Sequence, residues 1–246
     1  MRNTHQRGIA IAPILFVVAI LAVLASAIAA GSGSFNGDTS AVKAKAQASA
    51  ILGYVNEVQI GVDRVLSRCP DTQISLANSV DSGYAENPLA PADKSCHVFD
   101  VNGGGVLIKE PPQDVDLTGV PPEIRYYFIH GNYRVMGFGN MPSDVGGNSG
   151  RELIIMLPGL RRELCLKIND MADVTMESGD IPIGGGFQAV KESQYWADAS
   201  SGWTVVCGTG GQNWGKSNCC TKTTGNISDA RIPIGSYVFF HVLHTR

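Results

Sequence analysis

The sequence predicts an exported α+β protein: an N-terminal hydrophobic helix, then an amphipathic helix packed on an antiparallel β-sheet head with a disulfide-stapled C-terminal loop. Three observations lead to this fold class. An uncharged apolar segment lies near the N-terminus, a helical pattern of apolar residues follows it, and from residue 70 short apolar runs alternate with Gly, Pro, Asn and Asp. The expected parts are a basic leader (1–8), a transmembrane or filament-core helix (9–30), a flexible joint (31–40), the amphipathic helix (41–69) and the head (70–246).

The composition excludes several classes of protein. Hydrophobic residues make up 44% of the chain and charged residues 17%, which suits a folded chain rather than a disordered one. The net charge is -3 and Lys and Arg form no cluster. We therefore expect no nucleic-acid binding, because neutralising phosphates requires a basic surface.

The segment from Ile9 to Ala30 contains no charged residue and is mostly Ile, Leu, Val and Ala. A helix of this length extends roughly 33 Å, enough to cross a hydrocarbon core of about 30 Å. Arg2 and Arg7 precede the segment, and all 22 acidic residues follow it. The positive-inside rule therefore predicts a cytoplasmic N-terminus and an exported head.

Three kinds of processing fit this segment, and each leaves a different mature N-terminus. An uncleaved anchor keeps Met1, whereas a secretory signal peptide would be cut near Ala27-Ile28-Ala29, where small residues flank the site. In the third, the leader MRNTHQRG is removed after Gly8 on the cytoplasmic side, so that the mature chain begins at Ile9.

The leader and the apolar run after it, IAIAPILFVVAILAVLA, resemble the N-terminus of type IV pilins and pseudopilins. The resemblance implies cleavage between Gly8 and Ile9 by a prepilin peptidase, with or without N-methylation. It also implies a helix that serves first as membrane anchor and then as filament core. Pro13 occupies the position where the family usually carries a Glu that pairs with a neighbouring subunit's amino terminus. Some minor pseudopilins of the family also lack this Glu.

After the Gly-rich joint, apolar or small residues recur at alternating steps of three and four. This spacing predicts an amphipathic helix with Ser40 as its N-cap and a stop at Cys69-Pro70. We favour packing of this seam on the chain's own head over an intermolecular coiled coil, because its alanines would make a thin dimer interface. The seam positions are Ala41, Ala44, Ala48, Ile51, Val55, Val58, Val62, Val65 and Cys69.

The head is predicted to be an antiparallel sheet. Gly131-Asn132 separates two apolar runs and predicts a two-residue hairpin turn. Past Pro158, apolar residues at helical spacing predict a short helix that carries Cys165, an arrangement that also resembles the heads of type IVb-like pilins. The candidate strands are 98–101, 106–109, 126–130, 133–138, 153–157, 203–207 and 237–243.

Six cysteines lie on the exported side, which predicts disulfides rather than free thiols. Six cysteines allow fifteen pairings. We favour Cys69–Cys96, which would attach the end of the amphipathic helix to the head, and a bond from Cys165 to the C-terminal trio. Cys219 and Cys220 are adjacent and are expected to take different partners. The disulfide candidates are Cys69, Cys96, Cys165, Cys207, Cys219 and Cys220.

Other patterns indicate ligand chemistry less specifically. Residues 210–217 match the phosphate loop G-x-x-x-x-G-K-[ST] letter for letter, but a poor helix former follows, and the motif needs a helix there. Tyr195, Trp196 and Trp214, among Gly, Ser and Asn, are candidates for carbohydrate or protein binding, with loop packing as the alternative. Trp203 is expected in the core.

The sequence contains no recognised metal-binding or catalytic motif. The C-terminal cysteines and several histidines are zinc-ligand types, but their spacing fits no zinc template, and no hydrolase signature occurs. We therefore assign no catalytic residue, no metal ligand and no cofactor. The residues weighed for zinc are Cys207, Cys219, Cys220, His97, His130, His241 and His244.

These features together predict a pilin-like or pseudopilin-like structural subunit of a cell-surface filament or secretion apparatus, either as a minor or tip component or as the major subunit, rather than an enzyme. The expected partners are the membrane, a prepilin peptidase and other pilin-like subunits in a homo- or hetero-filament. The expected location is the inner membrane with the head in the periplasm, or a filament at the cell surface. The alternative is a membrane-anchored periplasmic or surface domain that binds a ligand and does not polymerise.

Overall fold

A computed structural model describes residues 40–77, 86–112, 126–135, 152–176, 179–184, 203–205, 207–208, 212–213, 215–223 and 234–245. Two compact units make up the chain, Met1–Lys43 and Ala44–Arg246, and the fold described below belongs to the second, apart from residues 40–43 at the start of the long helix. The expected leader, apolar segment and joint lie outside the described residues, apart from Ser40. Among the described helices, none is both long enough and apolar enough to span a membrane.

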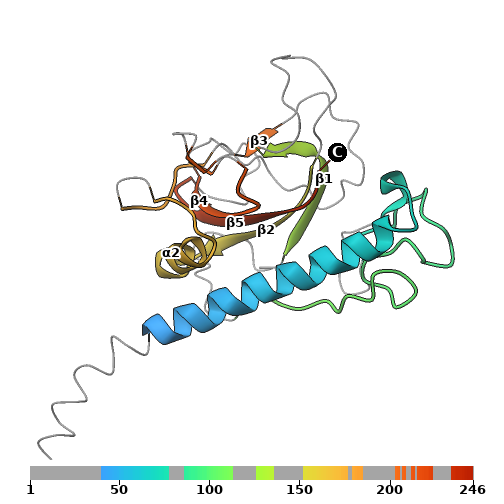
Figure 1. Cartoon of the computed structure of the whole chain (residues 1–246), viewed down its shortest axis with the longest axis horizontal. Coiled ribbons are helices and arrows are strands. Elements are labelled where there is room, and N and C mark those ends of the chain that lie inside the picture. Colours follow the sequence, from blue (N-terminus) through green and yellow to red (C-terminus); the bar gives the residue numbers. More distant parts are fainter. Residues whose placement is uncertain are drawn as a thin grey trace, which may run out of the picture. The chain divides into compact units, whose positions relative to one another are not determined.

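Over the described residues the fold is α+β, as expected, with two helices and one five-stranded sheet (Figure 1). The sheet is mixed rather than antiparallel throughout as predicted, because residues 203–205 pair in parallel with residues 133–135. A long helix occupies residues 40–66 and is followed by a short 3-10 turn, η1 (Asp71–Gln73). The second helix, α2 (Arg162–Met171), follows strand β2 directly. The sheet has the order β3-β1-β2-β5-β4, with strands β1 (Tyr127–Val135), β2 (Glu152–Leu160), β3 (Trp203–Val205), β4 (Asn218–Lys222) and β5 (Tyr237–His244).

The long helix packs on the chain's own sheet through the predicted seam. From Ala48 to Cys69 every seam residue is buried, whereas Ala41 at the start of the helix is exposed. The seam shares one hydrophobic core with Leu164 of α2 and Phe239 of β5, so both helices cover the same face of the sheet. The coiled-coil alternative for this seam is therefore wrong, because its apolar residues are already buried within the chain.

The middle of the sheet is buried on both faces. All nine residues of β2 are buried, including Pro158, and so are the six residues 238–243 of β5. Ile155 and Phe239 join the core beneath the helices, while Ile154 and Phe240, whose side chains alternate to the opposite face, are buried as well. A sheet covered on both faces explains why these strands read as continuous apolar runs rather than alternating ones.

The hairpin predicted at Gly131-Asn132 is wrong. These residues lie inside the single strand β1, which pairs antiparallel with β2 on both sides of them. The register shifts between His130 and Tyr133, so the two residues form an irregularity in the ladder. A Gly-Asn pair suits a bulge as well as a turn, and here Tyr133 still pairs with Glu152 of β2 while residues 133–135 pair in parallel with β3.

The strands predicted at 98–101 and 106–109 are also absent from the described fold. Residues 98–104 are turns, and a single backbone bond, from Val106 N to Val98 O at 3.2 Å, joins the two arms. The glycines between the arms press against the chain, since a Cβ at Gly103 would lie 1.8 Å from His97 O. Strand β4 was not predicted, because it lies in the segment expected to be a stapled loop.

Candidate functional site: the long helix and the loops fixed to it

The long helix keeps an uncharged face turned away from the core. Every residue on this face is exposed, and Ile60 is 60% exposed. A Cβ added at Gly53 would meet nothing within 4 Å in the part of the chain that the structure describes, so the packing seen there gives no reason for glycine. Glycine in the middle of a helix costs about 1 kcal/mol relative to alanine. We call this face the outer stripe; it consists of Ala46, Ser49, Gly53, Asn56 and Ile60.

The segment 102–109 runs antiparallel along one flank of the helix. Arg64 Nη1 donates to the carbonyl oxygen of Gly104 at 2.7 Å, and Arg68 Nη2 donates to Asn102 O at 3.0 Å and to Gly103 O. Because hydrogen bonds to charged donors are stronger than neutral ones, two guanidinium groups can hold a loop that has no regular strand. The glycines allow the approach that these bonds require.

Further along this flank, the fit depends on a second small residue of the helix. A Cβ at Gly61 would lie 2.2 Å from Val106 Cγ2, so glycine is needed for the buried Val106 side chain to reach the helix. Lys109 then pairs with Glu57, and its backbone nitrogen donates to the Tyr54 hydroxyl at 3.4 Å. Burial raises the pKa of Tyr54 to about 12, so this hydroxyl stays neutral.

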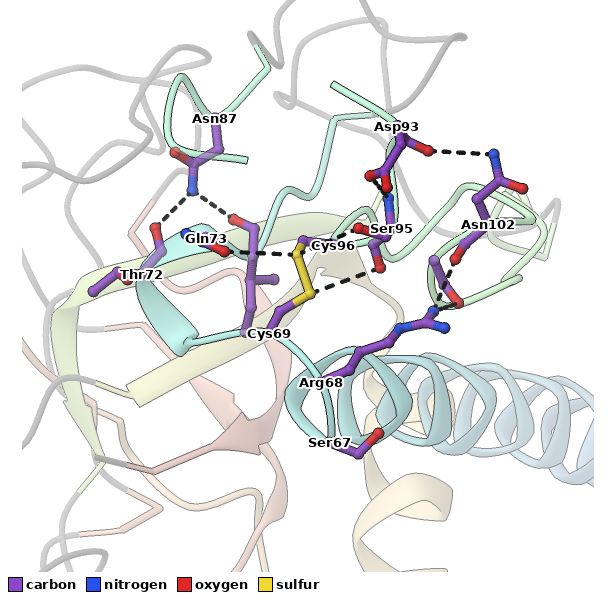
Figure 2. The surroundings of a disulfide bond; sticks show 12 residues. Ser67, Arg68, Cys69, Thr72, Gln73, Asn87, Asp93, Ser95, Cys96 and Asn102 are labelled. Atoms are coloured by element: carbon purple, nitrogen blue, oxygen red, sulfur yellow. Dashed lines mark hydrogen bonds between the residues drawn. A yellow bond between two sulfur atoms is a disulfide. The ribbon is translucent and has the colours of Figure 1, made fainter. Parts of the chain in front are cut away.

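The disulfide between Cys69 and Cys96 attaches the end of the helix to the loop that leads into the segment 102–109 (Figure 2). Figure 2 shows Arg68 reaching from the helix to the turn that carries Asn102, beside the disulfide. Behind the disulfide, the buried Asn87 amide donates to the carbonyl oxygens of Thr72 and Ile74, at 3.0 and 2.8 Å. The loop is therefore fixed at several points and presents a defined surface.

That surface carries apolar side chains. Val101 is 87% exposed and Leu107 is 71% exposed, and Leu107 directly follows the Val106 that packs on the helix. Large apolar side chains that are exposed to solvent on a fixed loop are typical of interaction surfaces. The other exposed apolar residues of the loop are Leu89 and Ile108.

The opposite flank of the helix meets the sheet through polar side chains. His241 of β5 is 5% exposed; its Nε2 lies 3.2 Å from Gln59 Oε1, and its Nδ1 lies 2.7 Å from Asn218 Oδ1. The Gln59 amide nitrogen also donates to Leu243 O at 2.6 Å. Burial lowers the pKa of His241 to about 4, so the imidazole is neutral near pH 7. Nothing in the sequence pattern indicated this cluster, because its members are up to 184 positions apart.

The C-terminal disulfides attach to both faces of β4. The structure pairs Cys165 with Cys220 and Cys207 with Cys219, and Cys69 with Cys96 as the sequence analysis favoured. Cys219 and Cys220 are neighbours on a strand, so their side chains point to opposite faces and must take different partners. Cys220 joins α2 on the helix-covered face, and Cys219 joins the chain after β3 on the other face.

The edge of the sheet at β4 is covered. The buried side chain of Asn169 in α2 donates to Cys220 O at 2.8 Å and accepts from Cys220 N at 2.7 Å. Lys222 N donates to Pro182 O at 2.9 Å, so residues 182–184 continue the cover. Because these backbone groups are already paired, β4 does not offer a free edge to another chain.

The phosphate-loop pattern does not have the structure that its chemistry requires. A strand, β4, follows Ser217, where the motif needs a helix whose amino terminus faces the phosphates. Lys216 pairs with Asp173 at 3.1 Å, and the buried amide of Asn213 donates to Thr175 O at 2.8 Å. These contacts assign the segment a structural role.

Of the remaining candidate site residues, the cysteines have defined partners, whereas the processing and aromatic candidates lie in parts of the chain that the structure does not describe. All six cysteines form disulfides, which removes the thiolates that a zinc site at Cys207, Cys219 and Cys220 would need. The described residues hold no group of three or more potential metal ligands. The processing candidates Gly8 and Ile9 and the aromatic candidates Tyr195, Trp196 and Trp214 all lie outside the described residues.

Comparison of the chain with known protein families, curated proteins and solved structures finds no match.

Proposed function

We propose that the protein is a pilin-like or pseudopilin-like structural subunit of a cell-surface filament or secretion apparatus, either as a minor or tip component or as the major subunit. One observation carries the proposal. A basic leader ending in Gly8 precedes an uncharged 22-residue segment, and the helix that follows buries its apolar seam in the hydrophobic core of the head. Such a chain can be held in a membrane by the first helix while the head remains a stable unit outside it.

The geometry of the head supports an assembly role in two ways. The outer stripe lacks the charges that usually face water on an amphipathic helix, which suits burial against a neighbouring subunit. The loop carrying Val101 and Leu107 is held by a disulfide and two arginines, so its apolar side chains can be buried by a partner without a large cost in ordering the loop.

The deciding experiment is N-terminal sequencing and intact mass of the protein from membranes of its native host. A chain that begins at Ile9 supports the proposal, whereas a chain that retains Met1 or begins near Ala30 contradicts it. Gly8→Val should block the processing, and Gly31→Val, a matched change beyond the apolar segment, should leave it unaffected. Processing in the presence of Gly8→Val would mean that another peptidase acts.

Assembly itself is tested on the outer stripe. Gly53→Lys places a charge in the middle of that face and should reduce the amount of protein recovered in sheared filaments or cross-linked assemblies at least several-fold. Gln212→Lys, an exposed residue in the turn before β4, is the control. Equal recovery of both variants, with unchanged head stability, would exclude the outer stripe as an assembly contact.

The alternative function is a membrane-anchored domain that binds a ligand and does not polymerise. Two features favour it: Pro13 replaces the family's usual Glu, and the Gly-rich joint separates two segments that pilins generally run as one helix. Retention of Met1 in the sequencing experiment, together with equal recovery of the two Lys variants, would favour this alternative.

A further inference from the structure

The two C-terminal disulfides are nested along the chain. Cys165 bonds to Cys220, and the Cys207–Cys219 bond lies inside the loop that this bond closes. The parts of an exported chain reach the oxidising compartment in sequence order, and Cys207 is the first cysteine to follow Cys165. Sequence order therefore does not lead Cys165 to its native partner.

Chain entropy does not distinguish the two neighbouring cysteines either. The loop from Cys207 to Cys220 is one residue longer than the native loop to Cys219, whose separation is 12, and this changes the probability of closure only about 1.1-fold. For Cys165, whose native separation is 55, the corresponding difference is smaller still. In the unfolded chain, a swapped set of bonds, Cys165–Cys219 with Cys207–Cys220, therefore forms about as readily as the native set.

The choice between the two neighbours depends on strand β4. Adjacent side chains of a strand point to opposite faces, so Cys220 faces α2 and Cys219 faces the other side of the sheet. Asn169, one helical turn after Cys165 on the buried face of α2, accepts a hydrogen bond from Cys220 N at 2.7 Å. The swapped set would require β4 to slip by one residue, which turns every side chain of the strand to the opposite face.

The register of β4 is fixed by β5, the last strand of the chain. Asn218 lies opposite His241 in the ladder, and its Oδ1 lies 2.7 Å from the imidazole Nδ1. A slip of one residue would turn Asn218 away from this contact. Because β5 (Tyr237–His244) follows all six cysteines in the sequence, it cannot guide their pairing until the end of the chain has reached the same compartment.

The completed fold closes the C-terminal disulfides to correction. Thiol–disulfide exchange requires a thiolate to reach one of the two sulfur atoms. The four cysteines concerned are all buried: Cys165, Cys207, Cys219 and Cys220. Mispaired bonds must therefore be rearranged before the sheet closes over them.

We propose that the C-terminal half of the head is a substrate of thiol–disulfide isomerisation: its four cysteines pass through the swapped set, and an isomerase of the exported compartment rearranges them. Each bond first forms from two thiols, whose two electrons and two protons pass to the disulfide oxidant of that compartment. The isomerase thiolate then attacks Cys219, forms a mixed disulfide and releases the Cys165 thiolate. Cys165 attacks Cys220 and releases Cys207. Cys207 attacks Cys219 and releases the isomerase thiolate, so the rearrangement itself consumes no electrons.

The remaining disulfide is an internal control. Cys69 and Cys96 are the first two cysteines of the chain, and no other cysteine follows until Cys165. Sequence order therefore leads them to each other without correction. The proposal requires only that the head be exported, which both candidate functions share, so retention of Met1 or a failure to polymerise would not affect it.

The first test oxidises the full chain in detergent micelles after reduction and denaturation. One sample receives diamide, which supplies no thiol, and the other a mixture of reduced and oxidised glutathione. Trypsin cuts after Lys216 and Lys222, so one peptide carries both neighbouring cysteines, and fragmentation between them by tandem mass spectrometry assigns their partners.

Four cysteines allow three pairings, of which one would join adjacent residues. We therefore expect the native C-terminal set in about half of the chains or fewer with diamide, and in nearly all of them with glutathione. Catalytic amounts of a thiol–disulfide isomerase should accelerate the change, and Cys69–Cys96 should form equally in both samples. Nearly complete native pairing with diamide alone would overturn the proposal.

Matched variants remove the ambiguity between the neighbours. Cys207→Ser with Cys219→Ser leaves Cys165 and Cys220, which should pair as completely with diamide as with glutathione. The companion variant, Cys165→Ser with Cys220→Ser, should do the same for the inner pair. The mapped bond is the readout, so neither variant has to fold. If both variants still required glutathione, the requirement would not arise from mispairing, and the proposal would be wrong.

The second test follows export in cells that contain or lack the thiol–disulfide isomerase of the exported compartment. Without it, the fraction of natively paired chains should fall to about half or less, while Cys69–Cys96 still forms. The variant Cys207→Ser with Cys219→Ser should show no such dependence. Equal native pairing of the wild type in both kinds of cell would show that folding alone directs these cysteines, against the proposal.

Discussion

The two flanks of the long helix are held to the head by different chemistry. On one flank, Arg64 and Arg68 bind backbone carbonyls of a glycine-rich loop that is also attached by a disulfide. On the other, Gln59 contacts the buried imidazole of His241. The first set of contacts uses guanidinium groups, which stay charged, whereas the second set includes a buried imidazole that is neutral near pH 7. One helix is therefore held on one side by charged and covalent contacts and on the other side by neutral polar contacts.

The largest expected loss of stability comes from adding a side-chain atom where the glycine-rich loop packs most tightly. Gly103→Ala places a Cβ 1.8 Å from His97 O and 2.7 Å from its carbonyl carbon, which are backbone atoms that cannot move aside cheaply. We expect a loss of about 4 kcal/mol in the free energy of unfolding, at the upper end for single substitutions. Urea unfolding under non-reducing conditions measures it. A loss below 1 kcal/mol would show that the loop is not held against His97.

The disulfide of the loop side comes next. Replacing Cys69 and Cys96 together by Ser opens a link between residues 27 positions apart, and chain entropy predicts a loss of about 3.5 kcal/mol. The matched pair Cys207 and Cys219, 12 positions apart, should lose about 2.8 kcal/mol. Unfolding of the two double variants in parallel tests the order. A larger loss at Cys207 and Cys219 would contradict the order that loop length predicts.

A smaller effect tests the contact between helix and loop directly. Gly61→Ala brings a Cβ to 2.2 Å from Val106 Cγ2 and should cost about 2 kcal/mol through overpacking. Val106→Ala removes the obstructing methyl groups, so the double variant should lose about 1 kcal/mol less than the sum of the single losses. Additive losses in this double-mutant cycle would mean that the two positions do not interact.

The smallest expected effect lies on neither flank. Gly53→Ala on the outer stripe meets no described atom within 4 Å, so it should raise the free energy of unfolding by about 1 kcal/mol through helix propensity alone. Thermal unfolding of the unassembled protein measures the change. A destabilised variant would indicate an intramolecular neighbour at this position.

The sequence predicted those parts of the fold that depend on local periodicity. The seam from Ala48 to Val65 is buried as its spacing indicated, and the apolar runs at 153–157 and 237–243 are strands. The prediction from the sequence was wrong at a position where the same local pattern is compatible with two different structures. Gly131-Asn132 can form a turn or a bulge, and the choice depends on whether β2 lies alongside both arms.

The candidate site shows the same division between sequence and tertiary structure. Oxidised cysteines follow from their even number on the expected exported side, and the adjacency of Cys219 and Cys220 indicated different partners. The strand β4, which directs the two side chains to opposite faces, was not predicted. Tertiary structure alone decided which of the two neighbouring cysteines bonds to Cys165, and it alone brought Gly61 against Val106 and formed the cluster around His241. The physical reason is distance along the chain: periodicity records which face of an element is apolar, but not which distant residue packs or hydrogen-bonds there.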